Sequence, residues 1–113
     1  MSESGTPAPV RQISAQELKA MREQGLPLQL LDVRTTEERA IASIAGARHL
    51  TQELATELQD LDRGTLLVFQ CHHGMRSQRA ALQFAAMGFT NVCNLSGGID
   101  AWSMAIDPSV PRY

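Results

Sequence analysis

The chain has 113 residues, of which 43% are hydrophobic and 19% are charged, and its formal net charge is −2. These values are typical of one globular domain and leave no room for a second hydrophobic core. The slight negative charge and the lack of a lysine- and arginine-rich cluster argue against a nucleic-acid partner. No apolar run is long enough to predict a membrane span.

The N-terminal stretch is mostly polar and contains two prolines. It predicts a disordered tail over residues 1–10, followed by a single folded domain over residues 11–113. The stretch lacks the basic start and apolar segment of a secretory signal. The two cysteines, Cys71 and Cys93, are too few for a disulfide framework in a chain of this length. We therefore expect a cytoplasmic protein whose thiols stay reduced.

Segments with helical spacing alternate along the chain with short apolar runs that favour strands. Capping boxes begin two of the helices, at Ser14 with Glu17 and at Thr35 with Glu38. The predicted helices cover residues 15–24, 36–41, 54–61, 76–87 and 99–105, and the predicted strands cover residues 28–34, part of 44–50, 65–70 and 91–95. An extended tail is expected from Asp107 onward.

This alternation predicts an α/β fold with a mainly parallel central sheet of about five strands and helices on both faces. In such sheets the functional site lies at the carboxyl ends of the strands. Arg34 and Cys71 each follow the apolar part of a predicted strand, so we expect them at the same rim of the sheet.

The chemistry is concentrated around Cys71. An apolar strand ends on this cysteine, a polar loop follows, and helical spacing begins at Arg76. Backbone N–H groups converge at such a helix start and stabilise an anion, which favours a thiolate near neutral pH. The layout predicts a nucleophilic cysteine, and a buried, inert thiol is the alternative. From these residues alone, phosphatase, reductase and sulfur-transfer chemistry are all open.

Four blocks along the chain resemble, in the same order, the rhodanese-like domain family. They are Asp32-Val33-Arg34 with Glu38, Ile44-Ala45-Gly46-Ala47, Cys71-His72-His73-Gly74-Met75-Arg76-Ser77, and Gly97-Gly98-Ile99-Asp100-Ala101-Trp102. The resemblance covers residues 12–102. The chain departs from the family pattern at Ala42-Ser43, where a glycine–histidine pair is common, and at Arg39, where an aromatic residue is common.

The resemblance implies a three-layer rhodanese-like fold and a single-domain sulfurtransferase, a thiosulfate sulfurtransferase (rhodanese). In such an enzyme Cys71 takes the outer sulfur of a donor such as thiosulfate as a persulfide, and cyanide or a thiol accepts it. The six residues from Cys71 to Arg76 match the loop that the family uses for sulfur, whereas phosphatase relatives have one residue more. A phosphatase or arsenate reductase is therefore the least expected function.

A protein-to-protein sulfur carrier or interaction module, acting in sulfur-cofactor or tRNA thiolation pathways, is the main alternative function. Residues 107–113 resemble the ends of rhodanese domains that are attached to adenylating enzymes of sulfur-carrier activation. The expected partners are a small-molecule sulfur donor and a thiol or protein acceptor, with no nucleic acid and no membrane.

The active-site loop that would bind the anionic sulfur consists of His72, His73, Gly74, Met75, Arg76 and Ser77. Arg76 either pins the loop by bonding its carbonyl groups, which we favour, or contacts the donor. Glu38 is a candidate partner of Arg76, but it is equally explained as a capping residue. Asp32 and Arg34 are expected to support the rim, with contact between Arg34 and the substrate as the alternative.

No metal and no cofactor is expected. The side chains of the adjacent residues His72 and His73 should point apart, and the usual ligand spacings are missing. The two imidazoles either help to attract an anionic donor or are simply exposed loop residues. Cys93 is expected in the core, with a resolving cysteine as the alternative. Trp102 is expected to anchor the last helix by packing.

Overall fold

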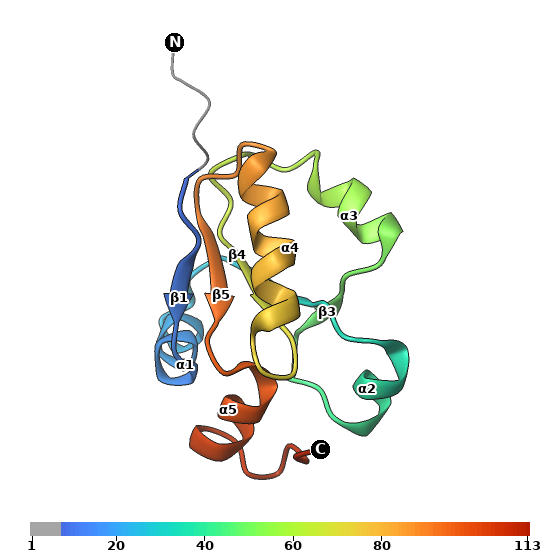
Figure 1. Cartoon of the computed structure of the whole chain (residues 1–113). Helices are drawn as coiled ribbons and strands as arrows, with labels where there is room; N and C mark the ends of the chain where they lie inside the picture. The colour runs from blue at the N-terminus through green and yellow to red at the C-terminus, as the bar shows by residue number, and fades with distance from the viewer. Residues whose placement is uncertain (1–7) are drawn as a thin grey trace.

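The computed structural model describes residues 8–113, and Figure 1 shows the arrangement of its elements. The strands are β1 (Arg11–Ile13), β2 (Gln29–Asp32), β3 (Arg48–His49), β4 (Leu67–Gln70) and β5 (Val92–Leu95). The helices are α1 (Ala15–Glu23), α2 (Thr36–Ile41), α3 (Gln52–Leu58), α4 (Met75–Ala86) and α5 (Gly98–Ala105). All strand pairs are parallel, in the order β1-β5-β4-β2-β3, which confirms the predicted α/β class.

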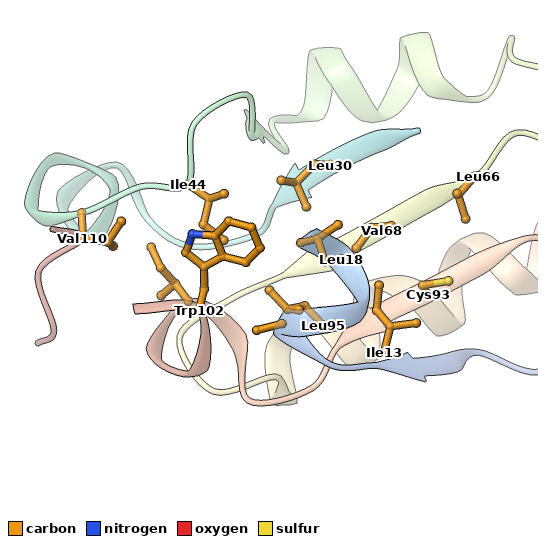
Figure 2. Close-up of a cluster of buried hydrophobic side chains, with 13 residues drawn as sticks. Ile13, Leu18, Leu30, Ile44, Leu66, Val68, Cys93, Leu95, Trp102 and Val110 are labelled. Atoms are coloured by element: carbon orange, nitrogen blue, oxygen red, sulfur yellow. The ribbon is translucent and has the colours of Figure 1, made fainter. Parts of the chain in front are cut away.

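Helices cover both faces of the sheet, and successive residues of each central strand face opposite cores. On β4, Val68 belongs to the hydrophobic cluster shared with α1 and α5, whereas Phe69 belongs to the cluster shared with α3 and α4. This two-sided burial is the reason that consecutive residues of the central strands are apolar, such as Leu30 and Leu31 in β2. Figure 2 shows the first cluster, with Val110 at one end and Cys93 near the other. Trp102 lies in this cluster and is 8% exposed, so its predicted packing role is confirmed.

Strand β1 and helix α3 differ most from the prediction. The sequence pattern shows no strand at β1 because this strand has three residues, its first two side chains are exposed, and it pairs with β5 alone. Helix α3 ends at Leu58 rather than at Leu61. The N–H groups of the next three residues bond to carbonyls three positions back, which is the tighter geometry that often ends an α-helix.

The segments at the two ends of the domain pack more closely than predicted. Most of the predicted N-terminal tail lies outside the described residues, but Val10 is partly buried against the cluster of α3 and α4. At the other end, Ser103 Oγ donates a hydrogen bond to the carbonyl of Val110, which is 8% exposed. Residues 107–113 therefore dock on the domain instead of extending from it. None of the helices in residues 8–113 has the length and apolar composition needed to cross a membrane.

The carboxyl ends of the parallel strands form one edge of the sheet, where α2, α5 and the C-terminus also gather (Figure 1). Asp32 at the end of β2 pairs in register with Gln70 at the end of β4. Arg34 and Cys71 follow these two strands and therefore share this edge, as the topology predicts. Helix α2 buries none of its residues, so polar contacts rather than a hydrophobic face attach it to the edge.

Candidate active site

Cys71 follows β4 directly, and its sulfur accepts hydrogen bonds from the loop and from the first turn of α4. The backbone N–H groups of Gly74 and Ser77 lie 3.1 Å and 3.4 Å from Cys71 Sγ, and Ser77 Oγ lies 3.3 Å from it. Gly74 has a φ of 106°, in the region that favours glycine, and it forms the N-cap of α4. The loop therefore surrounds the sulfur with donors.

The electrostatic environments of the two cysteines are opposite, although both are buried. Cys71 is 1% exposed, and this burial by itself raises the pKa of its thiol. Hydrogen bonds from Ser77 and from the backbone N–H groups of Gly74 and Arg76 outweigh burial and hold the pKa of Cys71 below its ordinary value. Cys93 is 0% exposed, and burial raises its pKa. Cys71 is thus the cysteine prepared to ionise, and Cys93 lies in the core.

Asn94 on β5 ties the loop to the sheet. Its Nδ2 donates to the carbonyl of Gly74 at 3.1 Å and to Gln12 Oε1 on β1 at 2.9 Å, and its Oδ1 lies 2.6 Å from Ser77 Oγ. The Ser77 hydroxyl has one hydrogen, so it donates either to Asn94 or to the sulfur of Cys71. Asn94 is not among the site residues predicted from the sequence, although a polar residue inside an apolar run at a strand's carboxyl end is a recognisable signal.

Glu38 connects three parts of the rim. Its carboxylate forms the capping box of α2 with Thr35, and it also accepts two hydrogen bonds from Arg76, at 2.6 Å and 2.8 Å. The hydroxyl of Tyr113 donates to it at 2.7 Å. These contacts, led by the hydrogen bond from Arg76, lower the pKa of Glu38 well below its usual range. Both explanations offered for Glu38, capping and pairing with Arg76, therefore hold together.

The side-chain hydrogen bonds of Arg76 within residues 8–113 go to Glu38 and not to the loop carbonyls that the sequence analysis favoured. The side chain of Arg76 is 46% exposed and reaches across the rim to α2 instead of folding back over the loop. Its charge is therefore balanced by Glu38, and the N–H groups of the loop are left as the donors nearest to the sulfur.

Asp32 and Arg34 form a buried ion pair beneath α2. Arg34 donates to both carboxylate oxygens of Asp32, at 3.0 Å and 2.7 Å, and the side chains of both residues are 0% exposed. Arg34 also donates to the carbonyls of Glu38 and Ala42 and to the hydroxyl of Tyr113. Burial raises the pKa of Asp32, but the bonds and charge of Arg34 outweigh it, so this pKa lies below its ordinary value. These hydrogen bonds join the guanidinium of Arg34 to Asp32, to α2 and to the C-terminal residue.

The histidines of the loop do not point apart as expected. The rings of His72 and His73 stack, with centroids 3.9 Å apart and an angle of 29° between their planes. Tyr113 stacks on His72 as well, with centroids 3.9 Å apart and planes 7° apart. Tyr113 lies far from the loop in sequence, and nothing in the local pattern indicated this contact. Met75, at the start of α4, is 83% exposed.

A hollow of about 400 Å³ borders the loop on the side of β1 and β5. It is lined by Gln12, His73, Gly74, Met75, Gln78, Asn94, Ser96 and Gly97. A larger hollow, of about 730 Å³, lies at the opposite, amino-terminal edge of the strands, and no predicted site residue lines it. The smaller hollow is the one that adjoins the loop of Cys71.

Residues 14–105 match the family model of the rhodanese-like domain, so the chain belongs to the rhodanese-like domain family. The thiosulfate sulfurtransferase GlpE of Pseudomonas aeruginosa is 33% identical over 93 residues, which are 81% of this chain and 83% of that protein. A rhodanese-like domain protein from Staphylococcus aureus has the same fold, with a TM-score of 0.72 at 28% identity, covering 92% of this chain and 99% of that one.

A second curated relative is much longer than this chain. The adenylyltransferase and sulfurtransferase MOCS3-2 of Zea mays is 33% identical over 109 residues, which are 89% of this chain but 23% of the maize protein. The chain thus spans about a quarter of that relative. Both curated relatives carry sulfurtransferase in their names, and the family predicted from the four sequence blocks is confirmed.

Proposed function

We propose that this domain is a thiosulfate sulfurtransferase that carries sulfane sulfur as a persulfide on Cys71. The observation that carries the proposal is the sulfur of Cys71 held within hydrogen-bonding distance of the N–H groups of Gly74 and Ser77. These donors stabilise the thiolate form of Cys71, so no side-chain base is needed beside the sulfur. The similarity to a thiosulfate sulfurtransferase over 81% of the chain supports the same reaction.

The reaction proceeds in two displacements. In the first, the Cys71 thiolate attacks the outer sulfur of thiosulfate, a new S–S bond forms, and the S–S bond of thiosulfate breaks to release sulfite. In the second, cyanide or a thiolate attacks the terminal persulfide sulfur, and the Cys71 thiolate leaves. No net oxidation or reduction of the protein results, and the same N–H donors face an anionic sulfur in both steps.

Loop length favours sulfur over a phosphoryl group. Cys71 to Arg76 spans six residues, so the ring of N–H groups closes on the sulfur of Cys71 itself at 3.1–3.4 Å. A tetrahedral phosphoryl group needs a wider ring of donors. Cys71 is also 1% exposed, which favours a compact donor such as thiosulfate.

Mass spectrometry after incubation with thiosulfate tests this proposal. The wild-type protein should gain one sulfur atom on Cys71, and added cyanide should remove it as thiocyanate. Cys71→Ser should gain none, while Cys93→Ala, which removes the other buried thiol, should keep the transfer. A wild-type protein that gains no sulfur, or a Cys71→Ser variant that still produces thiocyanate, overturns the proposal. Hydrolysis of an aryl phosphate would favour a phosphatase instead.

A second candidate function is that of a sulfur carrier that exchanges persulfide sulfur with another protein. The similarity to the maize adenylyltransferase and sulfurtransferase over 89% of this chain favours it. Met75, an apolar side chain 83% exposed at the start of α4, lies at the rim that a protein acceptor would approach. Fast persulfide formation with slow release to cyanide and small thiols is the expected signature of the carrier, whereas rapid turnover with cyanide favours the enzyme.

A further inference from the structure

Three side chains of metal-ligating types meet beside the active-site loop. His72 and His73 of the loop and Asp100 of α5 each place one ligand atom within 4.8 Å of the other two. His73 Nε2 lies 3.7 Å from Asp100 Oδ2. The expectation of no metal rested on missing ligand spacings and on imidazoles that diverge, but the two rings lie 3.9 Å apart and stack. The side chains therefore lie close enough to share one ion, although their spacing in the sequence is unusual.

The imidazole of His72 is held in place and has an unused nitrogen. Its Nε2 is buried and has no hydrogen-bond partner among the described residues. Tyr113 stacks on the ring with planes 7° apart, which fixes its orientation. A buried polar atom left without a partner destabilises the fold. A bound ion would give this nitrogen the partner that the neighbouring side chains do not supply.

The carboxylate of Asp100 is oriented by a neighbour, as carboxylate ligands commonly are. Arg112 donates to both of its oxygens, at 2.8 Å and 3.3 Å. The backbone N–H of Asp100 also donates to the carbonyl of His72 at 3.2 Å, which fixes the spacing between the loop and α5. The side chain of Asp100 is 14% exposed, so it is largely shielded from solvent. Such supporting contacts preorganise a ligand before the ion arrives.

We propose that His72, His73 and Asp100 form a binding site for one divalent transition-metal ion, with Zn²⁺ as the fitting example. Two imidazoles and one carboxylate are a donor set that Zn²⁺ accepts, whereas Mg²⁺ and Ca²⁺ prefer oxygen ligands. Three protein ligands leave a coordination position for water or another small ligand. The ion would join the loop that carries Cys71 to α5, and this proposal does not depend on the sulfurtransferase reaction.

Calorimetric titration of the full chain with Zn²⁺ tests the site. A Cys71→Ser background removes the nearby thiolate, so that this sulfur cannot bind the ion itself. One ion should bind per chain, and His73→Ala or Asp100→Asn in this background should weaken binding at least about tenfold, with Arg112→Ala weakening it about tenfold through lost orientation. The third histidine, His49, lies outside the cluster, so His49→Ala should leave the affinity unchanged.

The spectrum of bound Co²⁺ and the melting temperature give a second readout. In the Cys71→Ser background, bound Co²⁺ should show the visible absorption of a four-coordinate site. This absorption should be missing when His73→Ala is added to the same background. Because the side chain of His73 is 63% exposed, the His73→Ala variant should fold normally. Zn²⁺ should raise the melting temperature of the Cys71→Ser protein but not that of the same protein with His73→Ala. Absence of binding at millimolar Zn²⁺, or binding that is unchanged in both His73→Ala and Asp100→Asn, overturns the proposal.

Discussion

Substitution of Gly98 by alanine tests whether the docking of α5 holds the active-site loop in place. A Cβ atom at Gly98 would lie 2.5 Å from the carbonyl oxygen of His72 and closer still to that of Cys71. Both carbonyls accept hydrogen bonds from α5, from the N–H groups of Ile99 at 2.8 Å and Asp100 at 3.2 Å. The added carbon therefore has to push the loop and the helix apart at the point where they are joined.

The magnitude follows by comparison with Gly25, which provides a matched control. Both glycines have a left-handed φ, +60° at Gly98 and +71° at Gly25, so alanine costs roughly 1–2 kcal/mol of backbone strain at either site. A Cβ at Gly25 meets nothing within 4 Å. At Gly98 the displaced packing and two weakened hydrogen bonds add about 3 kcal/mol to the loss of unfolding free energy.

Urea denaturation and the rate of persulfide formation together measure this effect. Gly98→Ala should unfold at clearly lower urea than Gly25→Ala, and its loop displacement should slow sulfur uptake about 100-fold. Gly25→Ala should take up sulfur at the wild-type rate. Equal losses of stability in the two variants, or normal sulfur uptake by Gly98→Ala, would refute the view that the contact with α5 positions the loop.

Three further substitutions probe the charges of the site. Ser77→Ala removes the hydroxyl that lies 3.3 Å from the sulfur of Cys71 and is shared with Asn94. The loss of this hydrogen bond should raise the pKa of Cys71, moving the inflection of its alkylation rate to higher pH. Asp32→Asn leaves the buried guanidinium of Arg34 without its counter-charge and should cost about 3–5 kcal/mol in thermal or urea unfolding. Glu38→Gln should cost about 1 kcal/mol at pH 7, because its ion pair is partly exposed. The lowered pKa of Glu38 stabilises the fold above its ordinary value of about 4.3, and this contribution is lost as the pH falls below it.

Each of these substitutions has an outcome that contradicts the reasoning. If the alkylation profile of Ser77→Ala stays in place or moves to lower pH, the Ser77 hydroxyl does not lower the pKa of the Cys71 thiol, and the backbone donors alone account for it. Wild-type stability of Asp32→Asn would mean that the arginine is sufficiently paired by carbonyl groups. For Glu38→Gln, an acid-induced loss of stability as steep as that of the wild type would assign the pH dependence to other carboxylates.

Elements that depend on residues close together in the sequence could be predicted. The capping boxes at Ser14 and Thr35 are present as predicted, because their hydrogen bonds span three residues. Strands β2, β4 and β5 were recognisable because burial on both faces gives each of them at least two consecutive apolar residues. Strand β1 was not, since a short edge strand with two exposed side chains leaves no hydrophobic pattern.

The candidate site also has one part that could be predicted from the sequence and another that could not. The loop after Cys71 follows from local spacing and from the position of a strand's end, and the structure places its N–H groups at the sulfur. The contact of Tyr113 with Glu38 joins residues 75 positions apart, and the stacking of Tyr113 on His72 likewise depends on how the last segment folds back. Contacts of this kind arise from the packing of α5 and have no signature in the residues themselves.

The attachment of α2 has a consequence for how the domain opens. This helix buries no side chain, and its contacts with the rest of the domain include the Arg76–Glu38 ion pair and the hydrogen bonds from Arg34 to the carbonyls of Glu38 and Ala42. An element held by charge rather than by an apolar face unfolds locally at a small free-energy cost, and salt weakens its exposed part. Amide hydrogen exchange should therefore be faster in α2 than in α4, and the difference should grow with ionic strength. Helix α2, which lies at the same edge of the sheet as the active-site loop, would then open while the hydrophobic core stays folded.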